Sequence, residues 1–377
     1  MGHKIVFYPV GNGDTSQIIL SNGKRLLFDF YKTATSEDAE TPTIDVAEAL
    51  KKELRQAKRT DFDVVAFSHA DMDHIQGAAD FFYLEHAQKY QSDDRIRIKE
   101  LWVPAAMVLE ESNDDSRVIR QEARYRLQRG IGIKVFSCPK RLDDLLDKWV
   151  TERKISSIKK NDILKKCIID AGQIIPGFSL VSDAVEFFVH SPFAKTVGTE
   201  SIPTNEAALI VHATFEINGF KTRYFIIGDA EADVLTDIVE ITQKKDNRER
   251  LIWDIYNIPH HCSYLALNND EKGEYETVPL EAICKLLDYG NKNCYLISSS
   301  DKIKENDQKQ PPHIQAYRAY CKYCKKRKIF VTMEYPNSQR PIPIVLEIGE
   351  NGAMEGDYET KGAAAIIEKR APRAGER

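Results

Sequence analysis

Four potential metal ligands stand within six consecutive positions, His69-Ala70-Asp71-Met72-Asp73-His74. Imidazole nitrogens and carboxylate oxygens are the side-chain groups that bind zinc and manganese. Buried carboxylates and imidazoles this close together are costly to remove from water, and a divalent cation offsets that cost. The alternative is a solvated turn in which Asp73 caps the helix that follows. We favour a metal site, because polar residues also end other apolar runs of the chain.

Three later segments end an apolar, strand-like run in a residue that can bind metal. The first run ends at Gly228 and Asp229, where a carboxylate can bridge two cations and glycine lets the backbone approach closely. The second ends at the adjacent His260 and His261, and the third ends at His190. A single histidine at a strand end is more often structural, so the adjacent pair is the stronger signal.

The elements around these residues predict how they come together. Turn residues separate three N-terminal strands, a helix follows, and a continuous apolar strand at 63–68 leads directly into the histidine and aspartate segment. Two strand-rich halves, each accompanied by helices, predict a four-layer αββα sandwich. We expect one domain over residues 1–350 and a mobile tail over 351–377. Further strands are expected at 5–8, 16–20, 25–30, 100–103, 184–189, 207–215, 222–227, 253–258, 293–298, 329–333 and 342–348, and helices at 44–57, 105–128, 231–243, 280–287 and 314–324.

The order of the motifs resembles the metallo-β-lactamase superfamily. His-x-Asp-x-Asp-His is followed by Gly-Asp and then by Pro-His-His-x-Ser. More narrowly, the chain is similar to the metallo-β-lactamase-like domain of bacterial DNA-uptake competence channel proteins and their stand-alone relatives. The Gly-x-Gly-Asp turn of that branch is matched by residues 11–14, its strand-ending aspartate by Asp29, and its asparagine before an apolar strand by Asn205. The resemblance covers roughly residues 4–350 and implies the αββα fold, a dinuclear site and phosphodiester chemistry on DNA.

The resemblance also implies how the ligands divide between two cations. His69 and Asp71 would serve one cation, the other would take Asp73, His74 and one of the paired histidines, and Asp229 would bridge them. We favour His261 as that ligand. The histidine that the superfamily places just before the Gly-Asp strand pair is absent, which leaves Asn205 or His190 as substitutes.

Three residues are expected to act on the substrate. We expect Asp73 to be both a catalytic residue and a metal ligand, and His260 to lie near the substrate phosphate or leaving group. His313, which follows two prolines, would be a substrate contact, and the alternative is a helix N-terminal residue without a catalytic part. Two cations would lower the pKa of a bridging water and supply a hydroxide nucleophile. Asp71 stands where the commoner superfamily motif has histidine, which makes manganese a competitor to zinc.

A nuclease or phosphodiesterase that acts on DNA or RNA is the leading functional hypothesis. Two basic segments favour nucleic acid as a partner: a predicted helical insertion at 140–166, and 322–328, where lysines follow Tyr320 and Tyr323. The alternative for both is a solvated helical face. A hydrolase of small phosphodiesters or other esters is a second hypothesis. A weakly active binding or regulatory module of a nucleic-acid defence or uptake system is a third.

The composition narrows the class of protein. The net charge of −5 over 377 residues gives no general attraction to polyanions, so nucleic-acid binding would need local basic surface. The apolar runs are far shorter than the roughly 20 residues that span a bilayer, and the first residues lack the pattern of an export signal. Seven scattered cysteines do not form a disulfide framework. We therefore expect a cytoplasmic protein without a membrane segment.

Overall fold

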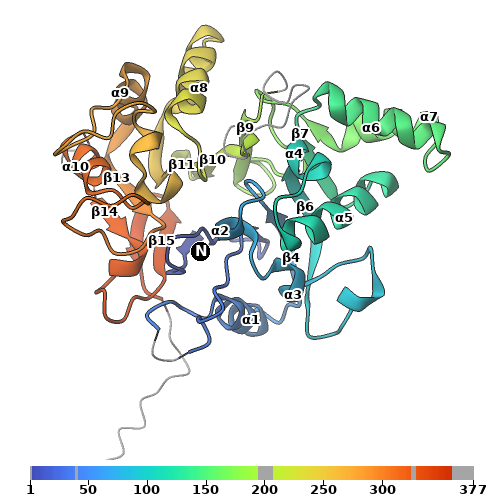
Figure 1. Cartoon of the computed structure of the whole chain (residues 1–377), viewed down its shortest axis with the longest axis horizontal. Coiled ribbons are helices and arrows are strands. Elements are labelled where there is room, and N and C mark those ends of the chain that lie inside the picture. Colours follow the sequence, from blue (N-terminus) through green and yellow to red (C-terminus); the bar gives the residue numbers. More distant parts are fainter. Residues whose placement is uncertain (1, 39–40, 194–206, 324–327, 359–377) are drawn as a thin grey trace, which may run out of the picture.

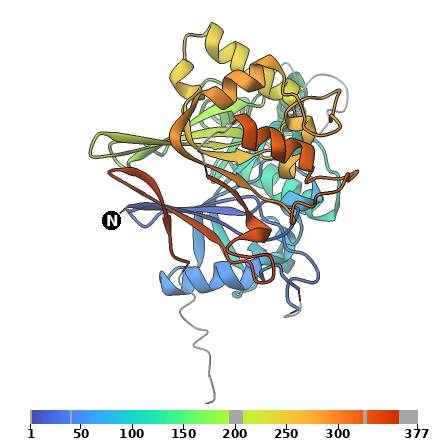
Figure 2. The same cartoon turned by 90° about the vertical axis from the view of Figure 1, so that its left-hand side faces the viewer.

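Two β-sheets lie face to face in the computed structural model, which describes residues 2–38, 41–193, 207–323 and 328–358 (Figure 2). Within these residues the first sheet has the order β16-β15-β1-β2-β3-β4-β6-β7-β8, with β5 beside β6, and the second has the order β14-β13-β12-β11-β10-β9. The strands of the first sheet are β1 (His3–Phe7), β2 (Ser16–Ile19), β3 (Arg25–Phe28), β4 (Asp61–Ala66), β5 (Phe82–Tyr83), β6 (Ile96–Pro104), β7 (Ile133–Phe136), β8 (Ile168–Ile169), β15 (Ile344–Gly349) and β16 (Gly352–Gly356). Those of the second sheet are β9 (Val185–Ser191), β10 (Ile210–Ile217), β11 (Phe220–Ile226), β12 (Trp253–Ile258), β13 (Gly290–Ser298) and β14 (Lys328–Val331).

A continuous apolar layer joins the two sheets. Because side chains alternate along a strand, every second residue of each sheet faces the other, and these residues form one buried cluster. Aromatic rings from both sheets meet there: the ring of Trp102 in β6 lies edge-on to that of Phe187 in β9, with centroids 5.6 Å apart. This layer fixes the two sheets relative to each other.

Helices cover the outer face of each sheet (Figures 1 and 2). One apolar cluster packs α1, α3, α4, α5, α6 and α7 onto the first sheet, and another packs α8, α9 and α10 onto the second. The predicted four-layer αββα sandwich is thereby confirmed. The helices are α1 (Val46–Gln56), α2 (Met72–Ile75), α3 (Ala78–Phe81), α4 (Ala105–Leu109), α5 (Asp114–Arg129), α6 (Lys140–Thr151), α7 (Ser157–Lys166), α8 (Ala232–Lys244), α9 (Glu281–Asp288) and α10 (Ile314–Tyr323).

Two predicted boundaries are wrong. The helix expected over 105–128 is two helices, because Asn113 starts α5 with a reciprocal capping box to Ser116 and interrupts the helix before it. The boundary expected at 351 is the second, because residues 352–356 form β16, which pairs with β15 and extends the first sheet. Residues 359–377 lie outside the described residues. No helix in the described part of the chain is both long and apolar enough to cross a bilayer.

The basic segment 140–166 consists of the two helices α6 and α7. Its apolar side chains, such as Leu146, belong to the outer cluster of the first sheet. The Lys160 ammonium lies 2.7 Å from Asp143 and 2.6 Å from Asp147, so part of the predicted positive charge is paired within the segment.

Candidate metal centre

The edge of the sandwich where parallel strands end gathers the predicted ligands. Strands β11, β12, β13 and β14 run parallel, so their carboxyl ends share one edge. Asp229 follows β11 and His261 follows β12, while His69 follows β4 in the facing sheet. A backbone bond from Leu209 N–H to the carbonyl of Ser68, 2.8 Å long, ties the two sheets together beside these residues.

The first ligand segment forms a loop and the short helix α2. Asp71 occupies the N-cap position of α2, although its side chain makes no capping hydrogen bond, and Asp73 lies inside the first turn. The alternative in which Asp73 caps the helix is therefore wrong. The helical turn places Asp73 and His74 side by side, and His74 is fully buried.

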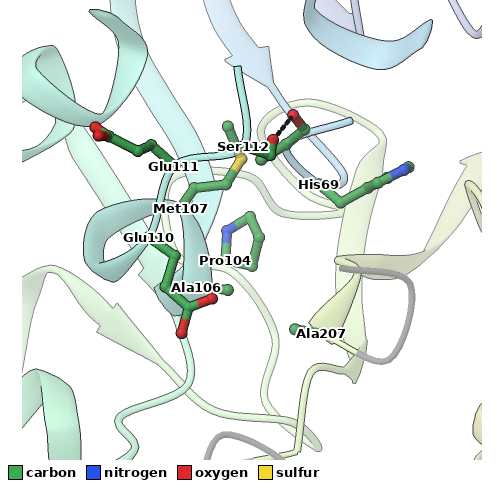
Figure 3. Close-up of a pocket in the computed structure, with 9 residues that line it drawn as sticks. His69, Pro104, Ala106, Met107, Glu110, Glu111, Ser112 and Ala207 are labelled. Atoms are coloured by element: carbon green, nitrogen blue, oxygen red, sulfur yellow. Dashed lines mark hydrogen bonds between the residues drawn. The ribbon is translucent and has the colours of Figure 1, made fainter. Parts of the chain in front are cut away.

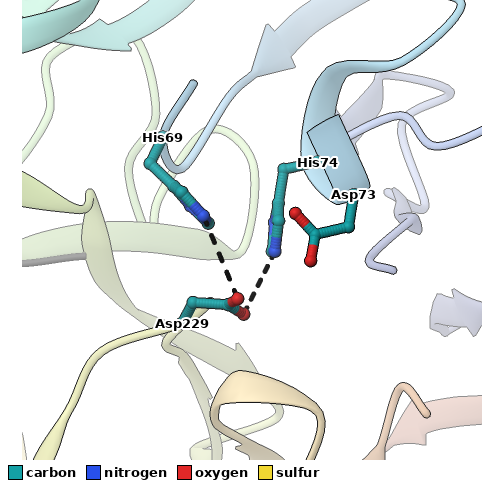
Figure 4. A group of neighbouring side chains, drawn as sticks. All are labelled: His69, Asp73, His74 and Asp229. Carbon is teal, nitrogen blue, oxygen red and sulfur yellow. Dashed lines mark ion pairs between the residues drawn. The ribbon is translucent and has the colours of Figure 1, made fainter. Parts of the chain in front are cut away.

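Asp229 lies at the meeting point of the imidazoles (Figure 4). Its carboxylate oxygens lie 3.1 Å from Nε2 of His74, 3.4 Å from Nε2 of His261 and 4.0 Å from Nε2 of His69. The other carboxylate, Asp73, lies 3.1 Å from Nε2 of His261. Donor atoms of His69, Asp73, His74 and Asp229 all lie within 4.8 Å of one another.

Asp29 and Ser68 together hold the Nδ1 atoms of two imidazoles. Asp29, at the end of β3, lies 2.9 Å from Nδ1 of His74 and accepts hydrogen bonds from both the N–H and the hydroxyl of Ser68. Because that hydroxyl donates to Asp29, it accepts from Nδ1 of His69, 2.9 Å away. These bonds leave Nε2 of both rings facing Asp229.

His261 is oriented in the same way, because its Nδ1 donates to the Ser299 carbonyl at 2.7 Å. All three rings thus present Nε2 to one point and satisfy Nδ1 elsewhere, which is the usual arrangement around metal-bound histidines. His261 belongs to a turn, His260–Cys262, in which all three residues have positive φ. Such backbone is unfavourable without glycine and is found where the surroundings enforce it, often at functional sites.

Burial and charge oppose each other in this cluster. Burial raises the pKa of Asp229, but His261 and His74 lower it further, and the net pKa is well below its usual range. Burial lowers the pKa of His74, yet Asp229 and Asp29 raise it well above its ordinary value. The site therefore favours ionised carboxylates and strongly attracts positive charge.

Three buried atoms in the cluster have no hydrogen-bond partner: Nε2 of His69, Nε2 of His74 and Oδ1 of Asp229. The last two lie close together, but their orientation does not make a hydrogen bond. Orphaned buried donors and acceptors are rare because each costs about 1–3 kcal/mol. A divalent cation accepts electron pairs from both nitrogen and oxygen, so this set of atoms fits one.

The structure describes one of two further predicted ligands. Asp71 lies 3.6 Å from Nε2 of His69 and its side chain is partly exposed. Asn205 lies outside the described residues. A metal position near His69 thus has Asp71 and Asp229 as its nearest carboxylates in the described chain.

The ligand role predicted for His190 is wrong. Along β9 the residues of odd number face the inter-sheet layer, so His190 points to the opposite, helix-covered face. Its Nε2 lies 3.0 Å from the Arg250 carbonyl, and its ring stacks on Phe225. The residue is structural, as a single histidine at a strand end usually is.

The two histidines expected near the substrate occupy different places. His260 belongs to neither donor set found around Asp229, and its Nδ1 lies 3.8 Å from Glu231. His313, predicted as a substrate contact, has its nitrogens 3.4 Å from the Tyr264 N–H and the Lys309 carbonyl. Its own N–H donates to the Cys262 carbonyl, so His313 supports the turn that carries His261.

Sequence reasoning missed Asp14 and Asp29 as site residues, although it matched both to the family pattern. Each is an acidic residue in a buried turn or at a strand end, the same signal that identified Asp229. The side chain of Asp14 is 10% exposed and its carboxylate lies 4.0 Å from Nδ1 of His74. Burial raises the pKa of Asp14, although His74 and His261 act in the opposite direction.

A pocket opens beside His69 (Figure 3). Its empty volume is about 390 Å³, its mouth included, and most of its lining is apolar, with Pro104 and Met107 among the larger side chains. Glu110 and Glu111 also line it, and they form ion pairs with Arg141 and Arg120. The Ser112 hydroxyl donates a hydrogen bond of 2.7 Å to the Ala70 carbonyl (Figure 3). This bond fixes the loop after His69.

Comparisons with known proteins give distant structural likenesses. No protein-family profile matches the chain, and no curated protein matches it by sequence. A diphosphatase of the PhnP family is 10% identical with a TM-score of 0.33, covering 92% of this chain and 98% of its own. The long form of RNase Z from yeast is 10% identical with a TM-score of 0.35, covering 82% of this chain and 38% of its own. The FEZ-1 metallo-β-lactamase from Legionella gormanii is 11% identical with a TM-score of 0.25, covering 65% and 73%. At these scores the fold rests on the layers and strand order of this chain itself.

Proposed function

We propose that the chain is a metal-dependent hydrolase whose centre is built from His69, Asp73, His74, Asp229 and His261. The observation that carries the proposal is the common orientation of the three imidazoles. Each holds Nδ1 in a hydrogen bond and turns Nε2 toward Asp229. A merely structural cluster would use those Nε2 atoms in hydrogen bonds, whereas two of them are orphaned.

The chain's own residues prepare the site in three ways. Asp29, Ser68 and Ser299 fix the rings, so little reorganisation is needed when a cation binds. Divalent cations at such a centre acidify a water molecule and neutralise charge on a substrate oxygen. Cys262, the thiol next to His261, is fully buried and its pKa is raised by burial, which argues against a cysteine nucleophile.

We propose a phosphodiester as the substrate, with DNA or RNA as the first class to test. The motif order of the sequence supports this class. Segment 140–166 carries nine lysines and arginines against five acidic residues, so it keeps positive charge despite the pairing of Lys160. A divalent cation held by these carboxylates would also bind the phosphate oxygens of such a substrate.

A small phosphodiester or ester is the second candidate, and the pocket beside His69 favours it. Its apolar walls fit a hydrophobic leaving group better than a charged nucleic-acid backbone. The two glutamates that line it add no free negative charge, because they pair with Arg141 and Arg120. The two candidates share the metal centre and differ only in what lies beside it.

The test combines metal analysis with a substrate panel. Purified protein is stripped with a chelator, reloaded with Zn²⁺ or Mn²⁺, and incubated with single-stranded DNA, duplex DNA, RNA and a chromogenic phosphodiester. We expect metal-dependent hydrolysis that Asp73→Ala removes. Cleavage of the small ester alone would select the second candidate, and a wild-type protein that binds no divalent metal would overturn both.

A further inference from the structure

The carboxylate of Asp14 is buried without a hydrogen-bond donor among the described residues. Its side chain is 10% exposed, and its Oδ2 lies 4.0 Å from Nδ1 of His74, too far for a hydrogen bond. A carboxylate in this position loses most of its hydration without gaining a hydrogen bond, which is unfavourable unless a positive charge compensates it. A divalent cation would compensate this charge, as it would satisfy the orphaned atoms around Asp229.

Two sets of donor atoms include Asp14, and one of them is available to a cation. The first set joins Asp14 with Asp29 and His74, but Nδ1 of His74 is already bonded to Asp29. The second set joins Asp14 with Asp229 and His261, all within 4.8 Å. In His261, Nδ1 donates to a backbone carbonyl, and Nε2, which lies 3.1 Å from the metal-ligand candidate Asp73, faces the second set.

The turn that carries Asp14 is fixed to the centre at several points. The N–H of Asp14 donates to the Asp73 carbonyl at 3.0 Å, which links the turn to the helix of the metal ligands. Asn12 donates to the Pro311 carbonyl at 2.7 Å and accepts from the Asp301 N–H at 2.8 Å. Gly11 has φ of 87°, a conformation that favours glycine. The carboxylate is therefore held in place rather than left in a free loop.

We propose that Asp14 is a metal ligand and completes a cation position with Asp229 and His261. The proposal rests on the metal centre of the proposed function and adds a ligand to it. The position offers two carboxylates and one imidazole. A position with two carboxylates and one imidazole accepts Mn²⁺ as well as Zn²⁺.

The first experiment compares Asp14→Asn with the wild type by titrating the metal-free proteins with Mn²⁺ and following free Mn²⁺ by electron paramagnetic resonance. The matched control is Asp254→Asn, the same change at a carboxylate near the opposite end of β12. We expect two Mn²⁺ per wild-type chain and per control chain. In Asp14→Asn, one of the two should bind at least tenfold more weakly.

Thermal unfolding gives a readout with opposite signs in the two metal states. Without metal, Asp14→Asn should be at least as stable as the wild type, because it removes a buried charge that makes no hydrogen bond. With saturating Mn²⁺ the wild type should be the more stable of the two. If Asp14 were a structural hydrogen-bonding residue, the variant would be less stable in both states.

A second variant, Asp14→Cys, tests direct ligation. Loaded with Cd²⁺, it should show a thiolate-to-cadmium charge-transfer band in the difference spectrum against the wild type, and Asp254→Cys should not. Unchanged Mn²⁺ binding in Asp14→Asn would overturn the proposal, and so would weakened binding without the cadmium band, which would make Asp14 a positioning residue. A wild type that binds no metal would overturn the proposed function itself.

Discussion

Oδ2 of Asp29 lies 2.9 Å from Nδ1 of His74, although the two residues are 45 positions apart in the chain. The contact joins the end of β3 to the helix that follows the neighbouring strand β4. It holds a fully buried ring in one orientation. The geometry of the metal centre therefore depends on a carboxylate that faces the ligands from behind.

Asp29→Asn should weaken metal binding while leaving the fold intact. The amide keeps the size of the carboxylate and can still accept from Ser68, but it no longer bears the charge that stabilises the His74 proton. Loss of such outer contacts typically costs 10–100-fold in metal affinity. Competition with a chromophoric chelator measures this loss, and Asp183→Asn, at a buried carboxylate paired with Lys24, serves as the control. Equal affinity in the two variants would contradict the role given to Asp29.

Metal should stabilise the folded chain, and Asp229 should be required for that effect. A ligand that binds only the folded state adds about 2.7 kcal/mol at one hundred times its Kd. We therefore expect chelator-treated protein to unfold at a higher temperature after Mn²⁺ or Zn²⁺ is added. Asp229→Asn removes the carboxylate that faces all three imidazoles and should abolish the shift in Tm. The same shift in both proteins would place the cation elsewhere.

The sequence indicated the layers and most of the centre because both follow local rules. The apolar runs that end in His69, Asp229 and His261 can be recognised in the sequence. Because the carboxyl ends of parallel strands meet at one edge of a sheet, residues that follow such runs lie close together. The face of a residue depends on register, which is why His190 was misplaced: one step along β9 moves a side chain to the other side of the sheet.

The partners of the ligands were harder to foresee. The support that Asp29 and Ser299 give to the rings comes from contacts between segments far apart in the chain, and no spacing rule encodes them. The backbone atoms that face the nitrogens of His313 could not be predicted for the same reason, since they depend on how α10 packs against the turn at 260–262.

Glu122 should stabilise the fold most above pH 5. It is fully buried and lies 2.6 Å from Arg126 and 2.9 Å from Nδ1 of His86. Burial raises its pKa, but hydrogen bonding to His86 and the charge of Arg126 lower it, from 4.5 to about 2. Because the pKa is lower in the folded state, the carboxylate stabilises the protein above the unfolded value of 4.5, and this contribution falls as the pH drops toward 2.

The shift of Glu122 corresponds to about 3 kcal/mol. Glu122→Gln should lower the free energy of unfolding by about that amount at pH 7. The difference from the wild type should shrink between pH 5 and pH 3 in urea titrations. A difference that stays constant over this range would show that packing, and not charge, explains the effect.

Gly228 provides a test of how closely the two sheets must approach at the centre. Its φ is 66°, and a β-carbon added there would lie 3.1 Å from Cβ and Oγ of Ser68, the residue that holds His69 and Asp29. Gly219, in the hairpin between β10 and β11, also has positive φ, but a β-carbon there would meet nothing within 4 Å. Alanine at either position should cost about 1 kcal/mol of stability from backbone strain. Only Gly228→Ala should also displace Ser68 and weaken metal binding. Equal metal affinities in the two variants would show that metal binding does not depend on the position of Ser68.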